Sequence, residues 1–306
     1  MNGPESSAES SKRAGTVVLV GWTNVGKSTL LNRLVGDKIA AVADVAQTTR
    51  SRITGVRNVA GQGQIVFVDT PGLHRARHRM NREMVRQSRQ SVYGVDLVLL
   101  IVDAQHGIGP GDRDAAELLC RADVKRLMVL NKIDRVQPKS KLLPLMQAAV
   151  EEWSFPEVLP VSALTGDGCD LLVERILARL PHGPPLFPDD YLTDQTERVL
   201  VAERIREKLL ELTTHELPHA TAVLTEVWHE RPDGLVEIEA TIFVDRDSQK
   251  QIVIGRGGQL LKQVGSEARR ELEQFLNRRI YLRLWVKVRK NWRDDERTLR
   301  ELGLTN

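Results

Sequence analysis

The 306-residue sequence has little cysteine and lacks any long apolar run. Its two cysteines, Cys120 and Cys169, are too few for a disulfide framework or a cysteine metal cluster, so a reducing cytoplasmic compartment is predicted. The longest apolar stretch lies between Asp96 and Asp103 and falls short of the roughly 18–20 residues that a transmembrane helix needs. The sequence therefore argues against a disulfide-rich secreted protein and against an integral membrane protein.

The N-terminus also lacks the apolar core of a signal peptide, because residues 1–14 are polar and rich in serine. We expect these residues to form a disordered leader. The remaining composition, with 41% hydrophobic and 28% charged residues, is ordinary for a globular protein. At roughly 150 residues per domain, the length predicts about two domains.

Positive charge is concentrated in one segment, although the net charge of the whole chain is only +3. Between Lys250 and Arg293, twelve Lys or Arg residues face three Glu residues, which is a surplus of nine positive charges. A local surplus of this kind indicates a polyanionic partner. The alternative is a solvated charged helix face with no partner.

Residues 15–181 alternate apolar strands with helical periodicity, which predicts an α/β domain with a mostly parallel sheet and helices on both faces. Helices are expected at Lys27–Val35 and Lys139–Trp153, and a more exposed strand at Ile53–Asn58. The buried strands are expected at Thr16–Val20, Gln64–Val68, Val95–Val102, Arg126–Leu130 and Glu157–Val161.

A second domain, of α+β class, is predicted for residues 194–306, after a Pro-rich linker at residues 182–193. The expected order of its elements is α-β-β-α-α-β. These elements are Asp194–Leu212, Thr221–His229, Leu235–Asp245, Gln249–Ile254, Gln259–Leu276 and Arg279–Val288.

A phosphate-binding loop is predicted between the first strand and the first helix. The segment from Gly21 to Ser28 matches the pattern G-x-x-x-x-G-K-[ST]. In such a loop the backbone N–H groups surround phosphate oxygens, Lys27 reaches the β- and γ-phosphates, and Ser28 is a ligand of Mg²⁺. The predicted nucleotide-binding residues here are Gly21, Trp22, Thr23, Asn24, Val25, Gly26, Lys27, Ser28 and Thr29.

A second phosphate-facing element, Asp69-Thr70-Pro71-Gly72, follows an apolar strand. Asp69 is predicted to hold the Mg²⁺ shell, and Gly72 to present its N–H to the γ-phosphate. In the polar loop before it, Thr49 is our choice to complete the Mg²⁺ shell, with Thr48 as the rival.

The base is predicted to be guanine. Asn131-Lys132-Ile133-Asp134 follows another apolar strand, and the Asp134 carboxylate can accept hydrogen bonds from guanine N1–H and the 2-amino group, which adenine cannot provide. Lys132 can lie over the ring, and Ser162-Ala163-Leu164 can approach the base oxygen. We therefore predict GTP as the substrate.

No catalytic side-chain base is expected for GTP hydrolysis. Ras-type enzymes orient the attacking water with a Gln directly after the glycine of this element, but Leu73 stands there in this sequence. Hydrolysis must then depend on positioning and on positive charge, to which Lys27 is predicted to contribute.

Taken together, GWTNVGKSTLLN, AQTTRSRITGV, DTPG, NKID and SAL resemble the bacterial GTPases of the TrmE–Era–EngA group. The stretches QIVIGRGGQLLKQVGSEARRELE and VKVRKNWRDDERTLRELGL resemble the type II KH domain and tail of the Era family. A single NKID disfavours the double-GTPase EngA type, and the C-terminal cysteine motif of the TrmE type is missing. The resemblance covers about residues 15–304.

This resemblance implies a GTP-hydrolysing switch whose KH domain binds the 3′ end of 16S rRNA and which assists assembly and maturation of the small ribosomal subunit. It also implies a cytoplasmic protein with some peripheral membrane association, and we expect a monomer. In this group K⁺ held by the P-loop Asn takes the place of an arginine finger, and Asn24 stands at that position. The alternative is that Asn24 only caps its own loop.

The RNA-binding residues are expected in the G-x-x-G loop, which clamps about four nucleotides in KH domains. Tyr281, Trp285 and Trp292 are expected to pack in the core or tail instead of stacking on bases. A bare G-x-x-G is also common in turns, but here it lies between two helices within the basic segment. The predicted RNA-binding residues are Gly255, Arg256, Gly257, Gly258 and Lys262.

Overall fold

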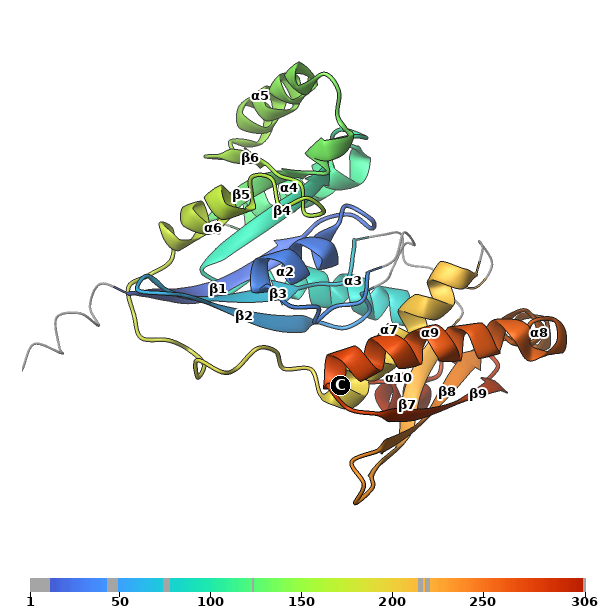
Figure 1. Cartoon of the computed structure of the whole chain (residues 1–306). Helices are drawn as coiled ribbons and strands as arrows, with labels where there is room; N and C mark the ends of the chain where they lie inside the picture. The colour runs from blue at the N-terminus through green and yellow to red at the C-terminus, as the bar shows by residue number, and fades with distance from the viewer. Residues whose placement is uncertain are drawn as a thin grey trace, which may run out of the picture. The chain divides into compact units, whose positions relative to one another are not determined.

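The computed structural model describes residues 12–42, 49–73, 78–122, 124–213, 217 and 221–304. The chain forms two compact units (Figure 1). Apart from two short segments before Met84, the first unit extends to Asp194 and the second begins at Gln195. In the described part of the chain, no helix combines the length and apolar character needed to cross a membrane.

The first unit contains a six-stranded sheet in the order β2-β3-β1-β4-β5-β6 (Figure 1). β2 pairs antiparallel with β3, and the other neighbouring strands pair in parallel, so the predicted mostly parallel sheet is confirmed. The strands are β1 (Arg13–Val20), β2 (Ile53–Val59), β3 (Gly63–Asp69), β4 (Leu97–Asp103), β5 (Arg126–Asn131) and β6 (Val158–Pro160).

Helices cover both faces of this sheet, which explains why its central strands are apolar at successive positions. In β1, Val17 and Leu19 pack in the cluster that includes α2 and α6, whereas Val18 and Val20 pack in the cluster that includes α4 and α5. The helices are α2 (Lys27–Val35), α3 (Arg79–Gln90), α4 (Pro110–Arg121), α5 (Leu142–Trp153) and α6 (Cys169–Leu177), with single 3₁₀ turns η1 (Ile133–Arg135) and η2 (Lys139–Lys141).

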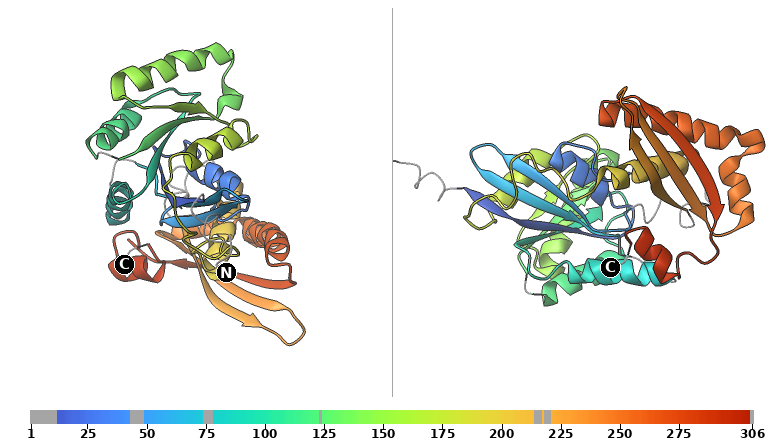
Figure 2. Two further views of the ribbon diagram at one scale, coloured as in Figure 1. Left: turned by 90° about the vertical axis from the view of Figure 1, so that its left-hand side faces the viewer. Right: turned by 90° about the horizontal axis from the view of Figure 1, so that it is seen from below.

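The second unit has the predicted α-β-β-α-α-β order and ends in an additional short helix. Its three strands pair antiparallel (β7 with β8) and then parallel (β8 with β9), and helices pack on one face of the sheet (Figure 2). The parallel pair requires a crossover, which two of the helices provide. The elements are α7 (Glu197–Leu212), β7 (Ala222–Glu230), β8 (Val236–Val244), α8 (Asp247–Ile254), η3 (Arg256–Gly258), α9 (Gln259–Leu276), β9 (Ile280–Val288) and α10 (Glu296–Glu301).

The first strand begins earlier than the predicted leader allowed. β1 starts at Arg13, which pairs with Gly63 of β3 and whose guanidinium donates to the carbonyls of Ala178 (3.0 Å) and Leu180 (2.6 Å). β1 therefore includes Arg13 and Ala14, which were predicted to belong to the disordered leader. Residues 1–11 of the predicted leader lie outside the described residues.

The Pro-rich segment predicted as a linker lies along the edge of the first unit's sheet. The buried amide of Gln64 accepts from the N–H groups of Leu186 (2.8 Å) and Phe187 (2.9 Å) and donates to the Phe187 carbonyl (2.8 Å). Further along, the Val56 N–H of β2 donates to the Leu192 carbonyl at 2.8 Å. Proline prevents a helix here but permits this extended course.

This edge segment, residues 186–194, also explains why β2 is less exposed than predicted. Ile53, Thr54, Gly55 and Val56 are all buried, although the sequence suggested a more exposed strand. The hydroxyl of Thr193 donates to the Thr54 carbonyl at 2.7 Å, so the segment covers the side of β2 that β3 leaves open.

Candidate nucleotide site and nucleic-acid interface

The predicted phosphate loop lies between the end of β1 and the first turn of α2. Gly26 has a φ of 93°, and a Cβ there would lie 2.4 Å from the Asn131 amide nitrogen, so glycine is required on both counts. The Lys27 ammonium donates to the carbonyls of Gly21 (3.1 Å) and Trp22 (2.9 Å). The loop is therefore curled around the lysine that is predicted to reach the phosphates.

Lys27 is held in a low-dielectric environment. Its side chain is only 6% exposed, and burial lowers the pKa of Lys27 to about 8, against the opposing effect of the Asp69 and Asp112 carboxylates. Asp112 was not singled out in the sequence, and its Oδ1 has no hydrogen-bond partner among the described residues. A buried ammonium of this kind gains strongly from an anionic ligand, because little solvent screens it.

Three oxygen-bearing side chains meet at the predicted magnesium position. The Ser28 hydroxyl donates to Asp69 Oδ2 at 2.8 Å, the Thr49 hydroxyl donates to the same oxygen at 3.1 Å, and the two hydroxyl oxygens are 2.5 Å apart. Thr48, the rival to Thr49, lies outside the described residues.

This oxygen cluster fits Mg²⁺. Asp69 is fully buried, its Oδ1 has no partner in the described part of the chain, and burial raises the pKa of its carboxyl while Lys27 opposes that shift. Mg²⁺ prefers oxygen ligands, commonly one or two carboxylates together with substrate phosphates. One carboxylate and two hydroxyls are such a set.

The Asp69–Gly72 element contacts the phosphate loop directly. A Cβ on Gly72 would lie 2.8 Å from Thr23 Cγ2 and 3.2 Å from the Lys27 ammonium, and the Leu73 N–H donates to the Gly21 carbonyl at 3.1 Å. The Thr70 hydroxyl donates to the Leu19 carbonyl at 2.8 Å. These contacts place the backbone of Gly72 beside Lys27, as a γ-phosphate contact requires.

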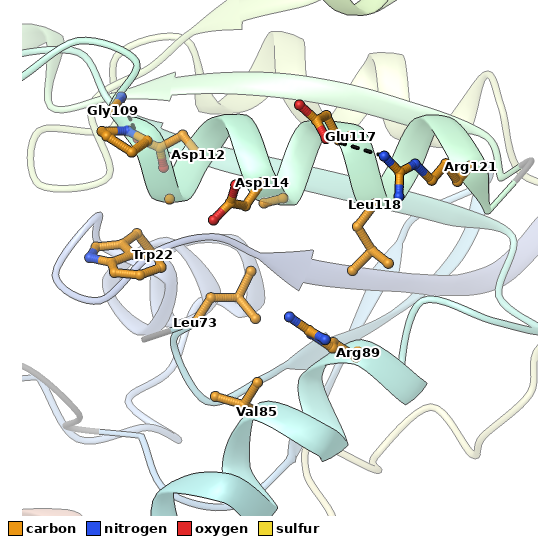
Figure 3. A pocket seen from close by; sticks show the side chains of 13 residues that line it. Trp22, Leu73, Val85, Arg89, Gly109, Asp112, Asp114, Glu117, Leu118 and Arg121 are labelled. Carbon is orange, nitrogen blue, oxygen red and sulfur yellow. Dashed lines mark hydrogen bonds and ion pairs between the residues drawn. The ribbon is translucent and has the colours of Figure 1, made fainter. Parts of the chain in front are cut away.

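Leu73 points away from the polar part of this site. Figure 3 shows its side chain with Trp22 and Val85 in a cleft between α3 and α4. The cleft has a volume of about 790 Å³, and Leu73 is 8% exposed. Leu73 therefore packs as an apolar residue and supplies no group that could orient water.

Asn131 of the predicted guanine motif bonds to both the phosphate loop and the Ser162–Leu164 loop. The Asn131 amide donates to the Val25 carbonyl at 2.8 Å and accepts from the Ala163 N–H at 2.9 Å. The Ser162 hydroxyl donates to Asp134 Oδ1 at 2.6 Å. The structure thus brings together three segments that are far apart in the sequence.

Lys132 has a partner that sequence reasoning missed. Its ammonium donates to the Asn24 carbonyl at 2.5 Å and lies 2.8 Å from Asp103 Oδ2. Burial opposes ionisation of Asp103, but hydrogen bonds from Lys132 and His106 outweigh it and lower the pKa of this carboxyl. The available signal was the position of Asp103 at the end of an apolar strand, like Asp69 and Asn131.

Asn24, the predicted K⁺ ligand, is exposed and has a φ of 62°. Asparagine tolerates this left-handed conformation better than most residues. Within the described part of the chain its side-chain amide makes no hydrogen bond, so no capping of its own loop is observed.

The predicted RNA-binding loop lies between α8 and α9, and three of its residues have positive φ values: Gly255 (73°), Gly257 (59°) and Gly258 (78°). A Cβ on Gly257 or Gly258 would meet nothing within 4 Å, whereas one on Gly255 would lie 2.8 Å from the Leu260 Cβ. Arg256 and Lys262 are exposed. The backbone of this loop is open to close approach by a ligand.

The basic segment contains two kinds of cation. Lys250, Arg256, Lys262, Arg269 and Arg270, on α8, α9 and the loop between them, have no carboxylate partner in the described parts of the chain. Four of the five cations of β9 and its continuation are paired instead, Lys290 being the exception among the described residues. The pairs are Arg283 with Glu239, Lys287 with Glu226, Arg289 with Glu301 and Arg293 with Asp245.

The aromatic residues of this segment do not all pack as expected. Trp292 is fully buried, but Tyr281 and Trp285 are 46% and 47% exposed. They alternate with Arg283 on the outward side of β9, which is the edge strand of the sheet. The expectation of core packing is therefore wrong for two of the three, because strand alternation places them opposite the helices.

Two family models match the chain. A model described as a 50S ribosome-binding GTPase matches residues 16–132, and a KH domain model matches residues 216–293. The two matched regions fall in the first and second units, where the nucleotide site and the Gly255–Gly258 loop lie.

Similar proteins and structures extend over nearly the whole chain. GTPase Era of Geobacter metallireducens is 49% identical over 96% of this chain and 98% of its own length, and GTPase Era of Lacticaseibacillus paracasei is 44% identical over 96% and 97%. A crystal structure of Era with MgGDPNP and nucleotides 1506–1542 of 16S ribosomal RNA has a TM-score of 0.94 at 39% identity, covering 96% of this chain and 100% of that one. A structure of an Aquifex aeolicus Era variant with GDP and AlF₄⁻ has a TM-score of 0.93, also at 39% identity, with the same coverage. The chain belongs to the Era family of GTPases.

Proposed function

We propose that this GTPase is a molecular switch that binds the 3′ end of 16S rRNA through its second unit and assists small-subunit assembly and maturation. The observation that supports the proposal is that one chain contains both the buried Lys27 and Asp69 of the predicted phosphate site and the Gly255–Gly258 loop with its unpaired cations. The related Era crystal structure, which contains MgGDPNP and 16S rRNA nucleotides together, supports the same combination here.

In this proposal GTP lies across the carboxyl ends of β1, β3 and β5. Lys27 and the N–H groups of the Gly21–Ser28 loop bind the phosphates, and Asp134 accepts from guanine N1–H and the 2-amino group. Ser28, Thr49 and Asp69 hold Mg²⁺, which when bound neutralises the charge on the β- and γ-phosphates.

Hydrolysis forms a bond from a water oxygen to the γ-phosphorus and breaks the bond to the β–γ bridging oxygen, giving GDP and phosphate. Since Leu73 cannot orient the water, the chain must act through charge at the transferring group. Lys27 supplies one positive charge. We propose that the Asn24 amide holds K⁺ as a second, because that amide is exposed and without a partner among the described residues.

For RNA, we propose that Gly255, Arg256, Gly257, Gly258 and Lys262 form the contact surface. Open backbone at the loop allows phosphates to approach, and exposed cations without carboxylate partners attract them. The proposed partner is the 3′ end of 16S rRNA on the maturing small subunit. The setting we propose is a cytoplasmic monomer with peripheral membrane association.

The test replaces Arg256 and Gly257 together by Asp and measures binding to an oligonucleotide with the 3′ end of 16S rRNA at several salt concentrations. We expect affinity to fall at least about tenfold, because the acids repel phosphates and the new side chain blocks the backbone. The wild-type affinity should itself fall steeply with salt, by a slope of about 0.7 per phosphate contact on a single strand.

A matched control carries the same change in charge elsewhere in the unit: Arg279→Asp with Gly234→Asp. Gly234 also has a positive φ (81°) and open space at its Cβ, and Arg279 is also exposed. The hairpin turn at Gly234 precedes β8, whereas the Gly255–Gly258 loop follows its far end by way of α8, so the two sites are well separated. Equal losses in both double variants would mean that only net charge matters and that the loop is an ordinary turn.

A further inference from the structure

Arg33, in the last turn of α2, binds the loop that is assigned to the guanine base. Its guanidinium Nε donates to the Ala163 carbonyl at 3.2 Å, and its Nη2 donates to the Leu164 carbonyl at 2.5 Å. Arg33 thus starts from the helix that begins with Lys27 and reaches two successive carbonyls of the Ser162–Leu164 motif.

Nothing else in the described part of the chain binds these two carbonyls. The other bonds of the loop hold different groups: the Ala163 N–H donates to Asn131, the Thr165 N–H to the Ser162 hydroxyl (3.1 Å), and the Gly166 N–H to the Ser162 carbonyl (2.8 Å). Arg33 is therefore what fixes the orientation of the peptide unit between Ala163 and Leu164.

That peptide unit carries a free donor. A trans peptide is planar, and its C=O and N–H point to opposite sides, so a bond that fixes the Ala163 carbonyl also fixes the Leu164 N–H. The Leu164 N–H has no acceptor among the residues that the structure describes. It points away from the guanidinium, and a cation on the carbonyl strengthens the N–H as a donor.

We propose that Arg33 is a positioning residue for guanine recognition: by holding the Ala163 and Leu164 carbonyls, it directs the Leu164 N–H to guanine O6. This rests on the proposed assignment of the Ser162–Leu164 loop to the base. Asp134 then reads the N1–H and 2-amino edge, and the loop held by Arg33 reads O6. The planar guanidinium fork suits two adjacent carbonyls, which a lysine ammonium cannot reproduce.

The experiment compares the dissociation constants of GTP, 6-thio-GTP and ITP for wild type and Arg33→Ala. In 6-thio-GTP a weakly accepting sulfur replaces O6, and ITP lacks only the 2-amino group. We expect Arg33→Ala to weaken GTP about five- to tenfold but 6-thio-GTP by less than twofold, so that the preference for GTP over 6-thio-GTP shrinks. The preference for GTP over ITP should not change, since Asp134 reads that group.

Two further variants keep the test decisive. Arg57 donates to the Leu34 carbonyl at 2.7 Å, near the same end of α2 but away from the base loop, so Arg57→Ala should leave all three constants within twofold of wild type. Arg33→Lys should fall between wild type and Arg33→Ala in its affinity for GTP and for ITP, the two nucleotides that carry O6. Thermal unfolding of each variant shows whether it is folded.

Equal weakening of all three nucleotides by Arg33→Ala, or no weakening of any, would overturn the proposal. Failure of the underlying base assignment looks different. In that case wild type itself would not discriminate GTP from 6-thio-GTP, whatever residue stands at position 33.

Discussion

The nucleotide site and the proposed RNA loop differ in how far their functional groups are exposed to solvent. In the first, Lys27, Asp69, Asn131 and Ser162 are each at most 6% exposed, and each makes a hydrogen bond to a neighbouring group of the site. In the second, Arg256 is exposed, and a Cβ on Gly257 or Gly258 after it would meet nothing within 4 Å. A small ligand is thus surrounded by fixed groups, whereas a polymer is received on an open surface.

This difference in exposure determines how strongly the charges of each region interact with a ligand. Buried charges interact through a low dielectric with little screening, so a few fixed groups are enough for specificity. Exposed cations act through water and are screened within about 8–10 Å at physiological salt. We therefore expect single substitutions to have large effects in the nucleotide site, and salt to have its large effect on RNA binding.

The largest expected effect comes from Lys27→Ala. Loss of one fixed donor at a transition-state charge typically lowers rates by about 100- to 1000-fold, and we expect the kcat/KM for GTP to fall by at least about 100-fold. Phosphate release at several GTP concentrations measures this. Lys141→Ala, at an exposed position on a 3₁₀ turn, serves as control. RNA binding without nucleotide should stay at the wild-type level. A loss of RNA affinity in Lys27→Ala would show that the two sites do not act separately.

The next effect is a change of base preference in Asp134→Asn. A hydrogen bond to a charged group contributes about 1.5–3 kcal/mol, so GTP affinity should fall roughly 10- to 100-fold. The amide reverses one donor–acceptor relation, so xanthosine triphosphate should bind more tightly than to wild type. Competition binding with both nucleotides measures this, with Asp114→Asn on α4 as control. Unchanged GTP affinity together with no gain for the xanthosine nucleotide would show that Asp134 does not contact the base.

A third effect is set by pH, because burial lowers the pKa of Lys27 to about 8. The ammonium form predominates below this pKa and is lost above it, and phosphates bind the charged form. GTP affinity should therefore fall about tenfold as the pH rises from about 7 to 9. In Lys27→Arg the charge persists, so any decline that remains comes from guanine ionisation, which both proteins share. If GTP affinity fell equally with pH in wild type and Lys27→Arg, the lowered pKa of Lys27 would be contradicted.

The smallest effect concerns K⁺. The Asn24 side chain is exposed, and contacts between exposed charges contribute about 0–1 kcal/mol, so hydrolysis should be no more than about fivefold faster in K⁺ than in Na⁺ at equal ionic strength. Asn24→Ala should remove the difference while keeping the rate in Na⁺. Equal wild-type rates in both salts would leave Asn24 as a residue chosen only for its positive φ.

The site residues that could be predicted from the sequence are those at the carboxyl ends of strands. Asp69 and Asn131 come directly after apolar runs, and parallel strands bring their carboxyl ends to one edge of the sheet, so the order of motifs was enough to predict their meeting. The helices Lys27–Val35 and Gln259–Leu276 also have their predicted bounds, because a phosphate loop or glycines begin each and Gly36 or Asn277 in left-handed conformation ends it.

The parts that could not be predicted depend on tertiary pairing. The bond of Arg33 to the base loop joins residues 130 positions apart, and no local pattern marks it. In the same way, Arg283 counts as one more cation in the sequence, but the register of β8 and β9 sets it beside Glu239 and neutralises it. The charge of a segment is thus visible in the sequence, whereas the distribution of its unpaired charge is not.

The 186–194 segment has a consequence for aggregation. An uncovered edge strand offers a row of free N–H and C=O groups to another chain, and proteins commonly cover such edges. Here the Leu192 carbonyl accepts from Val56 and the Asp189 carbonyl from the Asn58 amide (both 2.8 Å), so part of the β2 edge is already occupied. A truncated first unit that stopped at Pro181 would uncover this edge and should self-associate, whereas one that continued to Asp194 should stay dispersed.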